Sequence, residues 1–315
     1  MYFEELAAEY CDLNVFNEET RITIIRIGRL FDIRAMCSVE EYSVRDIAQF
    51  KRITLANAKT VTYNGYLRYL RIIGDYAVAQ GYAESNHFRT VKTGPVPAGV
   101  SKSLSDNDLW QLLSHLDDNK QRYDPVWFWL AVIKTLYFTG MRRRQLVSLR
   151  VSDLDFELMV IKLSHQGSKT YREWSIPMHS VLVGVFQEVM TKSSSVLDRP
   201  LAPSDPLFNV CWHNGRYKPC EQVAGQMRAR AITDFFKRVN KNTGLNIGAH
   251  KFRHTVATRL CNPAEGAPDI FAVQQILGHT MISTTRRYVS MSSGRLTKVL
   301  GEMNLPNLAQ KVLTR

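Results

Sequence analysis

The spacing of apolar and polar positions predicts that the first third of this 315-residue chain is helical. Ile24, Ile27 and Phe31 recur at the three- and four-residue intervals of an amphipathic helix. The same interval runs through residues 60–80, which we expect to form one long helix with a basic face. The pattern therefore predicts a bundle of four or five helices before residue 92.

The helical pattern breaks in residues 92–100, which contain two prolines and two glycines. Proline fixes φ and lacks an N–H group, so this stretch cannot continue a helix and should follow an extended path. We therefore assign residues 1–92 to a helical N-terminal domain, residues 93–104 to an interdomain linker and residues 105–315 to a second domain.

Beyond the linker the period of the pattern changes. Residues 105–149 predict three helices, the first capped by Ser105 and the second ended by Gly140. Residues 158–163 and 173–177 read as two short strands around a turn. Further helices are expected at 180–192, 221–242, 250–260 and 269–278, with a loop over 193–220. The predicted fold class is mainly α with a small antiparallel β-sheet in the second domain (α+β).

The charge of the chain points to a polyanionic partner. Lys and Arg number 41 against 29 Asp and Glu, which gives a net charge of +12 and favours nucleic acid. The excess is uneven: residues 1–46 hold ten acids and five arginines, whereas residues 47–104 hold eight basic residues and two acids. We therefore expect the positive surface to begin near Lys51.

The cysteines and the apolar segments indicate the cellular compartment in which the protein is expected. Five cysteines without tight spacing imply no disulfide framework, and reduced thiols are the default for such a chain. The first residues are acidic and lack the apolar run of a signal peptide, and no stretch reaches the eighteen apolar residues of a membrane span. These observations predict a cytoplasmic protein.

Three separated motifs carry candidate chemistry. The first is Thr139-Gly140-Met141-Arg142, in which Arg142 opens a helix and can face an anion. Taken alone, this segment favours a surface arginine beside a helix cap over a functional one.

The second motif is His250-Lys251-Phe252-Arg253-His254. His250, Arg253 and His254 share one helix face, so His250 and Arg253 can meet the same ligand. His250 titrates near neutrality and suits proton transfer, and Arg253 suits a second contact to an anion. The competing hypothesis is a metal site built from His250, His254, Cys261 and His279, which the arginine between the two histidines disfavours.

The third motif is Leu277-Gly278-His279, followed nine residues later by Tyr288. In chain order the motifs supply Arg142, Arg253, His279 and Tyr288. This set suits attack of a phenol on a phosphodiester, because fixed cationic donors stabilise the charge that the phosphate oxygens gain in the transition state. A covalent phosphotyrosine conserves bond energy, so rejoining would need neither ATP nor a metal.

With these residues the chain resembles the tyrosine recombinases of the phage-integrase type. The resemblance covers residues 105–315 and implies the catalytic set Arg142, Lys169, His250, Arg253, His279 and Tyr288, with Tyr288 as the nucleophile. Lys169, eight residues before Pro177, would protonate the 5′-oxygen leaving group. One departure is visible: Gln145 stands where the family usually has Glu, so we expect a hydrogen bond there and no salt bridge.

The resemblance also implies partners. The two domains would form a clamp around double-stranded DNA, within a homotetramer that joins two duplexes through a Holliday junction. A C-terminal tail helix, about residues 293–315, would dock on a neighbouring protomer, although it can also fold back on its own domain. Accessory DNA-bending or directionality proteins, a nucleoid location and a bacterial or phage origin fit this class. The candidate phosphate contacts are Lys51, Arg52, Lys59, Arg68, Arg71, Lys92 and Arg143.

Two alternatives remain open at this point. A type IB topoisomerase uses similar chemistry as a monomer, and a non-catalytic DNA-binding regulator could use the same scaffold. The linker, the Leu-Gly-His turn and the apolar tail favour the recombinase over the topoisomerase. The chain retains the tyrosine, both arginines, the lysine and both histidines, which favours an enzyme over a regulator. Only Gln145 supports the regulator.

Overall fold

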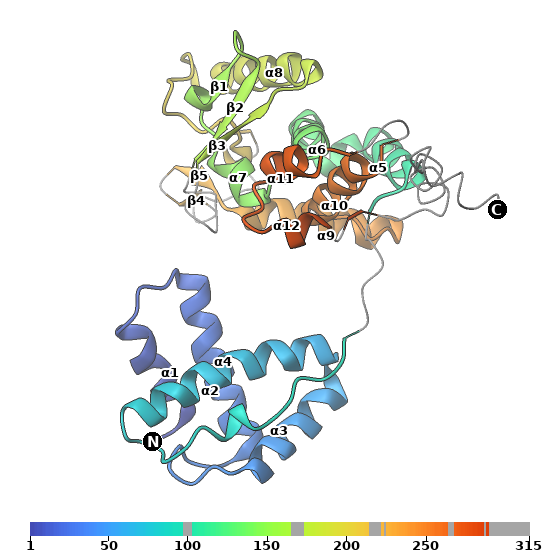
Figure 1. Ribbon diagram of the computed structural model, residues 1–315. Coiled ribbons are helices and arrows are strands. Elements are labelled where there is room, and N and C mark those ends of the chain that lie inside the picture. Colours follow the sequence, from blue (N-terminus) through green and yellow to red (C-terminus); the bar gives the residue numbers. More distant parts are fainter. Residues whose placement is uncertain are drawn as a thin grey trace, which may run out of the picture. The chain divides into compact units, whose positions relative to one another are not determined.

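The chain divides into two compact units, Met1–Gly99 and Val100–Arg315, in the computed structural model (Figure 1). The structure describes residues 1–96, 103–164, 173–213, 222–223, 225–263, 268–286 and 288–289. Within these ranges no helix is long and apolar enough to cross a membrane.

The first unit is a bundle of helices. Its helices are α1 (Phe3–Asp12), α2 (Glu18–Ala35), α3 (Val44–Asn57), α4 (Thr60–Ala79) and the short 3-10 helix η1 (His87–Arg89). The long helix expected over residues 60–80 is α4. Polar side chains set the starts: Asn17 accepts the N–H of Thr20 at 2.9 Å at the start of α2, and Asp46 accepts the N–H of Ser43 at the start of α3.

An aromatic core holds this bundle together. Phe3, Phe31 and Phe88 are fully buried, and their rings meet edge to face at centroid distances of 4.7–5.6 Å. Helices α1 and α2 approach closely because Gly28 lacks a side chain: a Cβ there would lie 2.4 Å from the carbonyl oxygen of Phe3.

The second unit combines helices with a small sheet. Its helices are α5 (Asp106–Asp118), η2 (Lys120–Tyr123), α6 (Val126–Thr139), α7 (Arg143–Ser148), η3 (Val151–Asp153), α8 (Ser180–Leu197), η5 (Val210–Trp212), α9 (Ala229–Thr243), α10 (Ala249–Cys261), α11 (Ile270–Leu277) and α12 (Ile282–Arg286). Helix α6 runs through the core and packs against α8 and α10. Its Trp129 stacks on Phe235 of α9, with ring centroids 4.2 Å apart.

The strands are short and antiparallel. They are β1 (Leu154–Asp155), β2 (Val160–Leu163) and β3 (Trp174–Pro177), in the order β1-β2-β3, with β4 (Gln222–Val223) and β5 (Gln226–Met227) as a separate pair. In the β2–β3 pair Ile161 faces Ile176, and both are buried. The prediction of a mainly α fold with a small antiparallel sheet is confirmed.

Two local predictions were wrong. The helix expected over residues 180–192 continues to Leu197, because Ser193 is fully buried and bonds His213 at 3.2 Å instead of ending the helix. The helix expected from residue 221 begins at Ala229. Residues 222–227 instead form the β4–β5 hairpin, where Gly225 adopts the positive φ of a tight turn.

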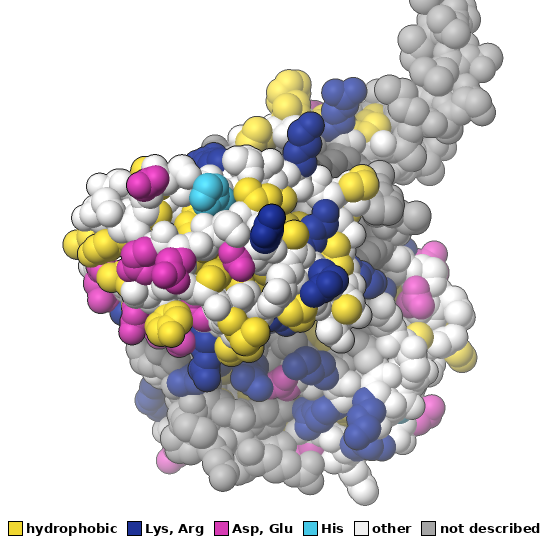
Figure 2. All heavy atoms as spheres, turned by 90° about the horizontal axis from the view of Figure 1, so that it is seen from below, with side chains coloured by type: hydrophobic (Ala, Val, Ile, Leu, Met, Phe, Trp, Pro, Cys, Tyr) yellow, Lys and Arg dark blue, Asp and Glu magenta, His cyan; other side chains and the backbone are white. Residues whose placement is uncertain are grey.

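Charge is segregated on the surface, as the sequence suggested. On the face shown in Figure 2, acidic side chains gather on one side, away from most of the Lys and Arg side chains. Lys51, Arg52, Lys59 and Arg68 of the first unit are exposed, as is Lys92. These side chains are accessible to an anionic partner.

Candidate active site

Arg253 joins three segments of the second unit. It lies on α10, is only 3% exposed, and donates from Nη1 to the carbonyl oxygen of Gly140 at 3.0 Å and from Nη2 to that of Leu277. Gly140 ends α6 and Leu277 ends α11. A single buried guanidinium therefore fixes the turn that leads to Arg142 and the turn that leads to His279.

The turn before Arg142 is held by further bonds. Gly140 adopts φ +61°, and a Cβ there would lie 3.1–3.2 Å from Leu277 and Val256, so the backbone passes close to α10 and α11. The Thr139 hydroxyl accepts the N–H of Met141 at 3.2 Å. The Gln145 side chain, 2% exposed, accepts the N–H of Arg142 at 2.8 Å. Arg142 is thus half-buried on a fixed backbone.

His279 and Tyr288 lie together at the end of the described chain. Their rings are nearly parallel, with centroids 6.2 Å apart. The Nδ1 atom of His279 is 2.9 Å from the Thr285 hydroxyl. When that hydroxyl donates to Nδ1, the ring proton lies on Nε2, which can then donate to a ligand. Asn262 donates to the carbonyl oxygen of Tyr288 at 2.8 Å and ties this segment to the end of α10.

The two histidines of the second motif reach the same region. His250 is exposed at the start of α10, and its ring centroid lies 4.5 Å from that of His254. The His254 ring in turn lies 5.3 Å from the Tyr288 ring. His250, His254 and Tyr288 therefore form a row of ring contacts.

The cationic groups are close enough to perturb one another. Burial, and after it the charge of Arg142, lower the pKa of Arg253 to about 9. Burial also lowers the pKa of Arg142, against the raising influence of Tyr288. Burial lowers the pKa of His279 to about 4, and Arg253 and Arg142 act in the same direction. At neutral pH the site therefore presents two cations and a neutral imidazole beside a phenol.

The structure thus brings together Arg142, Arg253, His279 and Tyr288, with His250 at the edge through His254. The sixth predicted residue, Lys169, lies outside the described residues, which resume at residue 173. The flanking strand is fixed to the site: the Trp174 indole donates to the carbonyl oxygen of Ile276 at 3.4 Å, just before the Leu-Gly-His turn.

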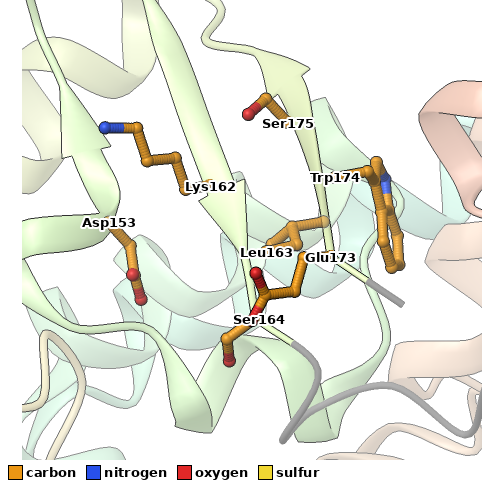
Figure 3. A pocket seen from close by; sticks show the side chains of 7 residues that line it. All are labelled: Asp153, Lys162, Leu163, Ser164, Glu173, Trp174 and Ser175. Carbon is orange, nitrogen blue, oxygen red and sulfur yellow. The ribbon is translucent and has the colours of Figure 1, made fainter. Parts of the chain in front are cut away.

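A pocket of about 390 Å³ lies beside these strands (Figure 3). It is lined by Asp153, Lys162, Leu163, Ser164, Glu173, Trp174 and Ser175. Lys162 is 4.0 Å from Asp155 and is exposed. The lining is mixed in charge, and among the described residues it includes none of the predicted catalytic side chains.

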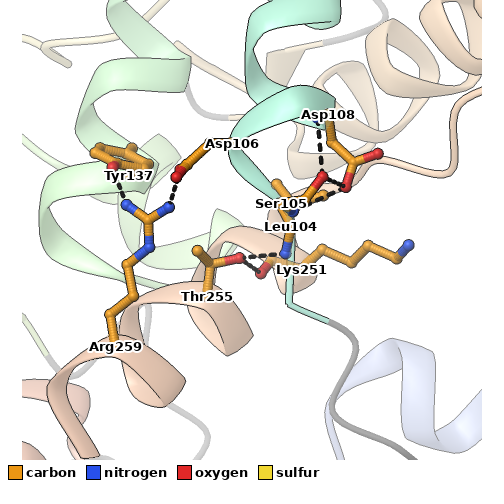
Figure 4. Close-up of polar contacts among 8 residues, drawn as sticks. All are labelled: Leu104, Ser105, Asp106, Asp108, Tyr137, Lys251, Thr255 and Arg259. Atoms are coloured by element: carbon orange, nitrogen blue, oxygen red, sulfur yellow. Dashed lines mark hydrogen bonds and ion pairs between the residues drawn. The ribbon is translucent and has the colours of Figure 1, made fainter. Parts of the chain in front are cut away.

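The segment that enters the second unit is bonded to α10 (Figure 4). The backbone N–H of Leu104 donates to the buried Thr255 hydroxyl at 2.7 Å. One turn further along α10, Arg259 donates to Asp106 and to the Tyr137 hydroxyl. The start of α5 is therefore attached to the helix that carries His250 and Arg253.

Two of the predicted DNA contacts, Arg71 and Arg143, donate hydrogen bonds to other described residues. Arg71 donates to the carbonyl oxygens of Phe88 and Val91, which holds η1 and the segment after it against α4. Arg143 is exposed and donates to the Thr233 hydroxyl. Both keep unused N–H groups, since a guanidinium has five. The roles of all seven candidates in DNA binding stay predictions.

Sequence patterns gave no signal for several residues that build this site. Thr285, Asn262 and Trp174 act through single bonds to residues 6, 26 and 102 positions away. Such pairs follow no local period. The contact of His254 with Tyr288 was also missed, although the i, i+4 relation to His250 placed both histidines on one helix face. Within the described residues, no group of three His, Cys, Asp or Glu side chains is arranged to hold a metal ion.

The chain is similar in sequence to known proteins. The model of the phage integrase family matches residues 102–295. A Pseudomonas syringae protein assigned as tyrosine recombinase XerC is 28% identical over 96% of this chain, and a Listeria monocytogenes tyrosine recombinase XerD is 28% identical over 74% of this chain and 73% of its own length. The chain spans a little under two thirds of the first curated relatives, 64% and 63%.

Solved structures show the same fold. The Tn1549 transposon integrase bound to transposon right end DNA superposes with a TM-score of 0.73 over 96% of this chain and 99% of that chain, at 21% identity. A lambda integrase dimer bound to a core site superposes with a TM-score of 0.65 over 90% of this chain and 97% of that chain, at 17% identity.

Proposed function

The chain belongs to the phage integrase family, and on this premise we propose that it is a site-specific DNA recombinase. Its substrate is double-stranded DNA, which it cuts and rejoins through a 3′-phosphotyrosine intermediate. The observation that carries the proposal is the meeting of Arg142, Arg253 and His279 around the Tyr288 ring. A DNA-binding protein needs cations, but it has no use for a phenol held beside buried guanidinium groups.

The cleavage step follows from these groups. The Tyr288 oxygen attacks the scissile phosphorus, a new P–O bond to tyrosine forms, and the bond from phosphorus to the 5′-oxygen breaks. His250 accepts the phenol proton, and Lys169 gives a proton to the leaving 5′-oxygen. Arg142 and Arg253 hold the non-bridging oxygens, and His279 donates from Nε2. The reverse reaction with a 5′-hydroxyl of another strand rejoins the DNA without ATP or metal.

The assembly is part of the same proposal. Two sequential strand exchanges pass through a Holliday junction within a homotetramer on two duplexes. A lambda integrase tetramer bound to a Holliday junction is among the solved structures with this fold. The first unit contacts the duplex through its exposed basic side chains, residues 93–104 link the two domains, and the tail docks on a neighbouring protomer. Accessory DNA-bending or directionality proteins, and a cytoplasmic location at the nucleoid, complete the proposal.

A covalent-adduct assay tests the chemistry. The DNA flanking the chain's own gene is first footprinted with the purified protein to locate a bound sequence. That sequence is then made as a duplex with a nick beside the cleavage position, so that the released fragment diffuses away and the phosphotyrosine accumulates. We expect an adduct that withstands denaturant with the native chain and none with Tyr288→Phe. The control Tyr2→Phe, which changes an exposed tyrosine of the first unit, should form adduct at the native rate.

The outcomes separate the alternatives. Binding without adduct from any native preparation would contradict the proposal and favour a non-catalytic regulator. Relaxation of supercoiled plasmids of any sequence by a monomer would favour a topoisomerase. Adduct formation in the Tyr288→Phe variant would exclude Tyr288 as the nucleophile.

A further inference from the structure

Gln145 lies in the turn that holds Arg142 and is nearly inaccessible to solvent. It is 2% exposed, and its Oε1 accepts the Arg142 N–H at 2.8 Å. Its Nε2 is buried and has no hydrogen-bond partner among the described residues. A buried amide donor left without an acceptor is unfavourable, because burial removes the hydrogen bonds that the group would make to water. The amide of Gln145 is therefore hydrogen-bonded through its oxygen but not, among the described residues, through its nitrogen.

Among the described residues, the guanidinium groups of Arg142 and Arg253 have no acidic side chain as a partner. Arg253 is bonded to two backbone carbonyl oxygens, and within the described part of the chain neither Arg142 nor Arg253 forms an ion pair with a carboxylate. Other arginines do find such partners, as in the Arg89–Asp75 and Arg199–Asp205 pairs. Those pairs are at least partly exposed, whereas Arg253 is buried and Arg142 is half-buried.

We propose that Gln145 is a positioning residue that fixes the Arg142 backbone while leaving the phosphate pocket without negative charge, so that a bound tetrahedral oxyanion supplies it. The inference rests on the proposed function, because the oxyanion in that case is the scissile phosphate. In the absence of DNA, inorganic phosphate occupies the same place and stabilises the folded chain.

A comparison of glutamine with glutamate at position 145 supports this role for Gln145. A glutamate at position 145 would keep the oxygen that accepts the Arg142 N–H and would replace the unpartnered NH2 group with a second, negative oxygen. That carboxylate would neutralise part of the charge that now attracts an anion. With glutamine at position 145, repulsion between the arginines lowers the stability of the unliganded protein and raises its affinity for phosphate. Because phosphate would bind only the folded state, it stabilises that state by RT ln(1 + c/Kd), where c is the phosphate concentration, so tighter binding gives a higher unfolding temperature.

Thermal unfolding with inorganic phosphate as the probe tests the inference. The full chain carries Tyr288→Phe, so that no covalent chemistry contributes. Unfolding is followed in millimolar sodium phosphate and in sodium chloride of equal ionic strength, which removes general screening. We expect phosphate to raise the midpoint, and Gln145→Glu to weaken the apparent phosphate affinity by about tenfold or more. Gln145→Glu should also unfold at a higher temperature than its parent in chloride alone.

Two further variants separate charge from shape. Gln111→Glu adds the same charge at an exposed position of α5 and should leave the phosphate response unchanged. Gln145→Met keeps the volume without adding charge, but it cannot accept the Arg142 N–H as the amide oxygen does, so it should weaken the phosphate response. Equal phosphate responses in the parent and Gln145→Glu would overturn the inference, as would an unchanged response in Gln145→Met.

If Gln145→Glu does not fold, the Tyr288→Phe parent still tests the inference. Absence of any phosphate-dependent shift in the unfolding temperature of that parent also overturns it. The readout is independent of the adduct assay. A phosphate response without adduct would mean that the pocket binds anions but performs no cleavage. Adduct without a phosphate response would leave the recombinase standing and remove only the role given to Gln145.

Discussion

The indole ring of Trp174 lies directly against the backbone of Gly278: a Cβ built on Gly278 would lie 2.3 Å from the ring atom Cζ2. Gly278 also adopts φ +60°, at the C-terminal end of α11. The contact joins β3 to the residue before His279. It therefore links the strand that follows the Lys169 turn to the position of His279.

Gly278→Ala should disturb both features. We expect the free energy of unfolding to fall by about 2–4 kcal/mol, which combines roughly 1 kcal/mol of left-handed backbone strain with 1–3 kcal/mol of overpacking against the indole. DNA cleavage should fall more steeply than DNA binding, since His279 moves with the turn. Urea unfolding and single-turnover cleavage measure the two effects.

Gly244→Ala provides the control for the backbone contribution. Gly244 has φ +71°, and nothing lies within 4 Å of the Cβ that alanine would add. Its cost should therefore stay near 1 kcal/mol. Equal costs at the two glycines would mean that the Trp174 contact has no energetic weight.

Arg253→Lys should damage the site although it keeps the charge. A lysine has one ammonium group and cannot bond the Gly140 and Leu277 carbonyl oxygens while also forking toward a phosphate. We expect cleavage to fall by roughly 100-fold or more, on the scale of losing one preorganised donor to a charged transition state. Arg230→Lys, at an exposed position of α9, should react like the native chain. A loss below threefold in Arg253→Lys would contradict the double role given to this guanidinium.

Sequence reasoning reached Arg142, Arg253 and His279 through local signals, such as a glycine after a helix or a helix face shared at i and i+3. Tyr288 has no such signal and was reached through its position nine residues after the Gly-His turn, taken together with the other motifs. It could not place Trp174 against Gly278, because nothing local links two residues 104 positions apart. The continuation of α8 to Leu197 was missed for a similar reason. The serines that suggest a helix end have low helix propensity, but burial of Ser193 against His213 overrides it.

Thr285→Val should separate orientation from binding. Valine has nearly the shape of threonine but cannot bond the Nδ1 atom of His279, so the imidazole loses the partner that keeps the proton on Nε2. One such hydrogen bond contributes about 1 kcal/mol, which corresponds to a roughly 3- to 10-fold slower cleavage step. The affinity for DNA should change little. Thr284→Val, next in the same helix, is the matched control, and an equal slowing there would remove the argument for orientation.

Acid should destabilise the folded chain through His279. Its pKa is lowered to about 4 by burial and by the two arginines, whereas an unfolded histidine titrates near 6.5. Between these values the unfolded chain binds the extra proton, so stability is complete above pH 6.5 and declines as the pH falls toward 4. At pH 5 the loss should amount to about 1–2 kcal/mol relative to pH 7.

The variant His279→Gln isolates this contribution. It should lose less stability than the parent between pH 7 and pH 5 when both are unfolded by urea. His87→Gln changes a histidine of the first unit and serves as the control for the general effect of removing an imidazole. Identical pH profiles for the parent and His279→Gln would show that another group governs the acid response.

The bonds between the start of α5 and α10 should differ in weight. Leu104 and Thr255 are 4% and 1% exposed, and the Leu104 N–H has the Thr255 hydroxyl as its acceptor. Thr255→Val leaves that N–H buried without a partner, which should lower the free energy of unfolding by about 1–3 kcal/mol. Arg259→Ala breaks the contacts to Asp106 and Tyr137 on an exposed surface, where an ion pair contributes about 0–1 kcal/mol.

Because Thr255 lies two residues from Arg253, Thr255→Val should also slow cleavage, whereas Arg259→Ala should leave the cleavage rate within about threefold of the native rate, as expected for an exposed pair. The reverse ranking of the two variants, in urea unfolding and in single-turnover cleavage, would show that the exposed ion pair and not the buried hydrogen bond sets the position of α10.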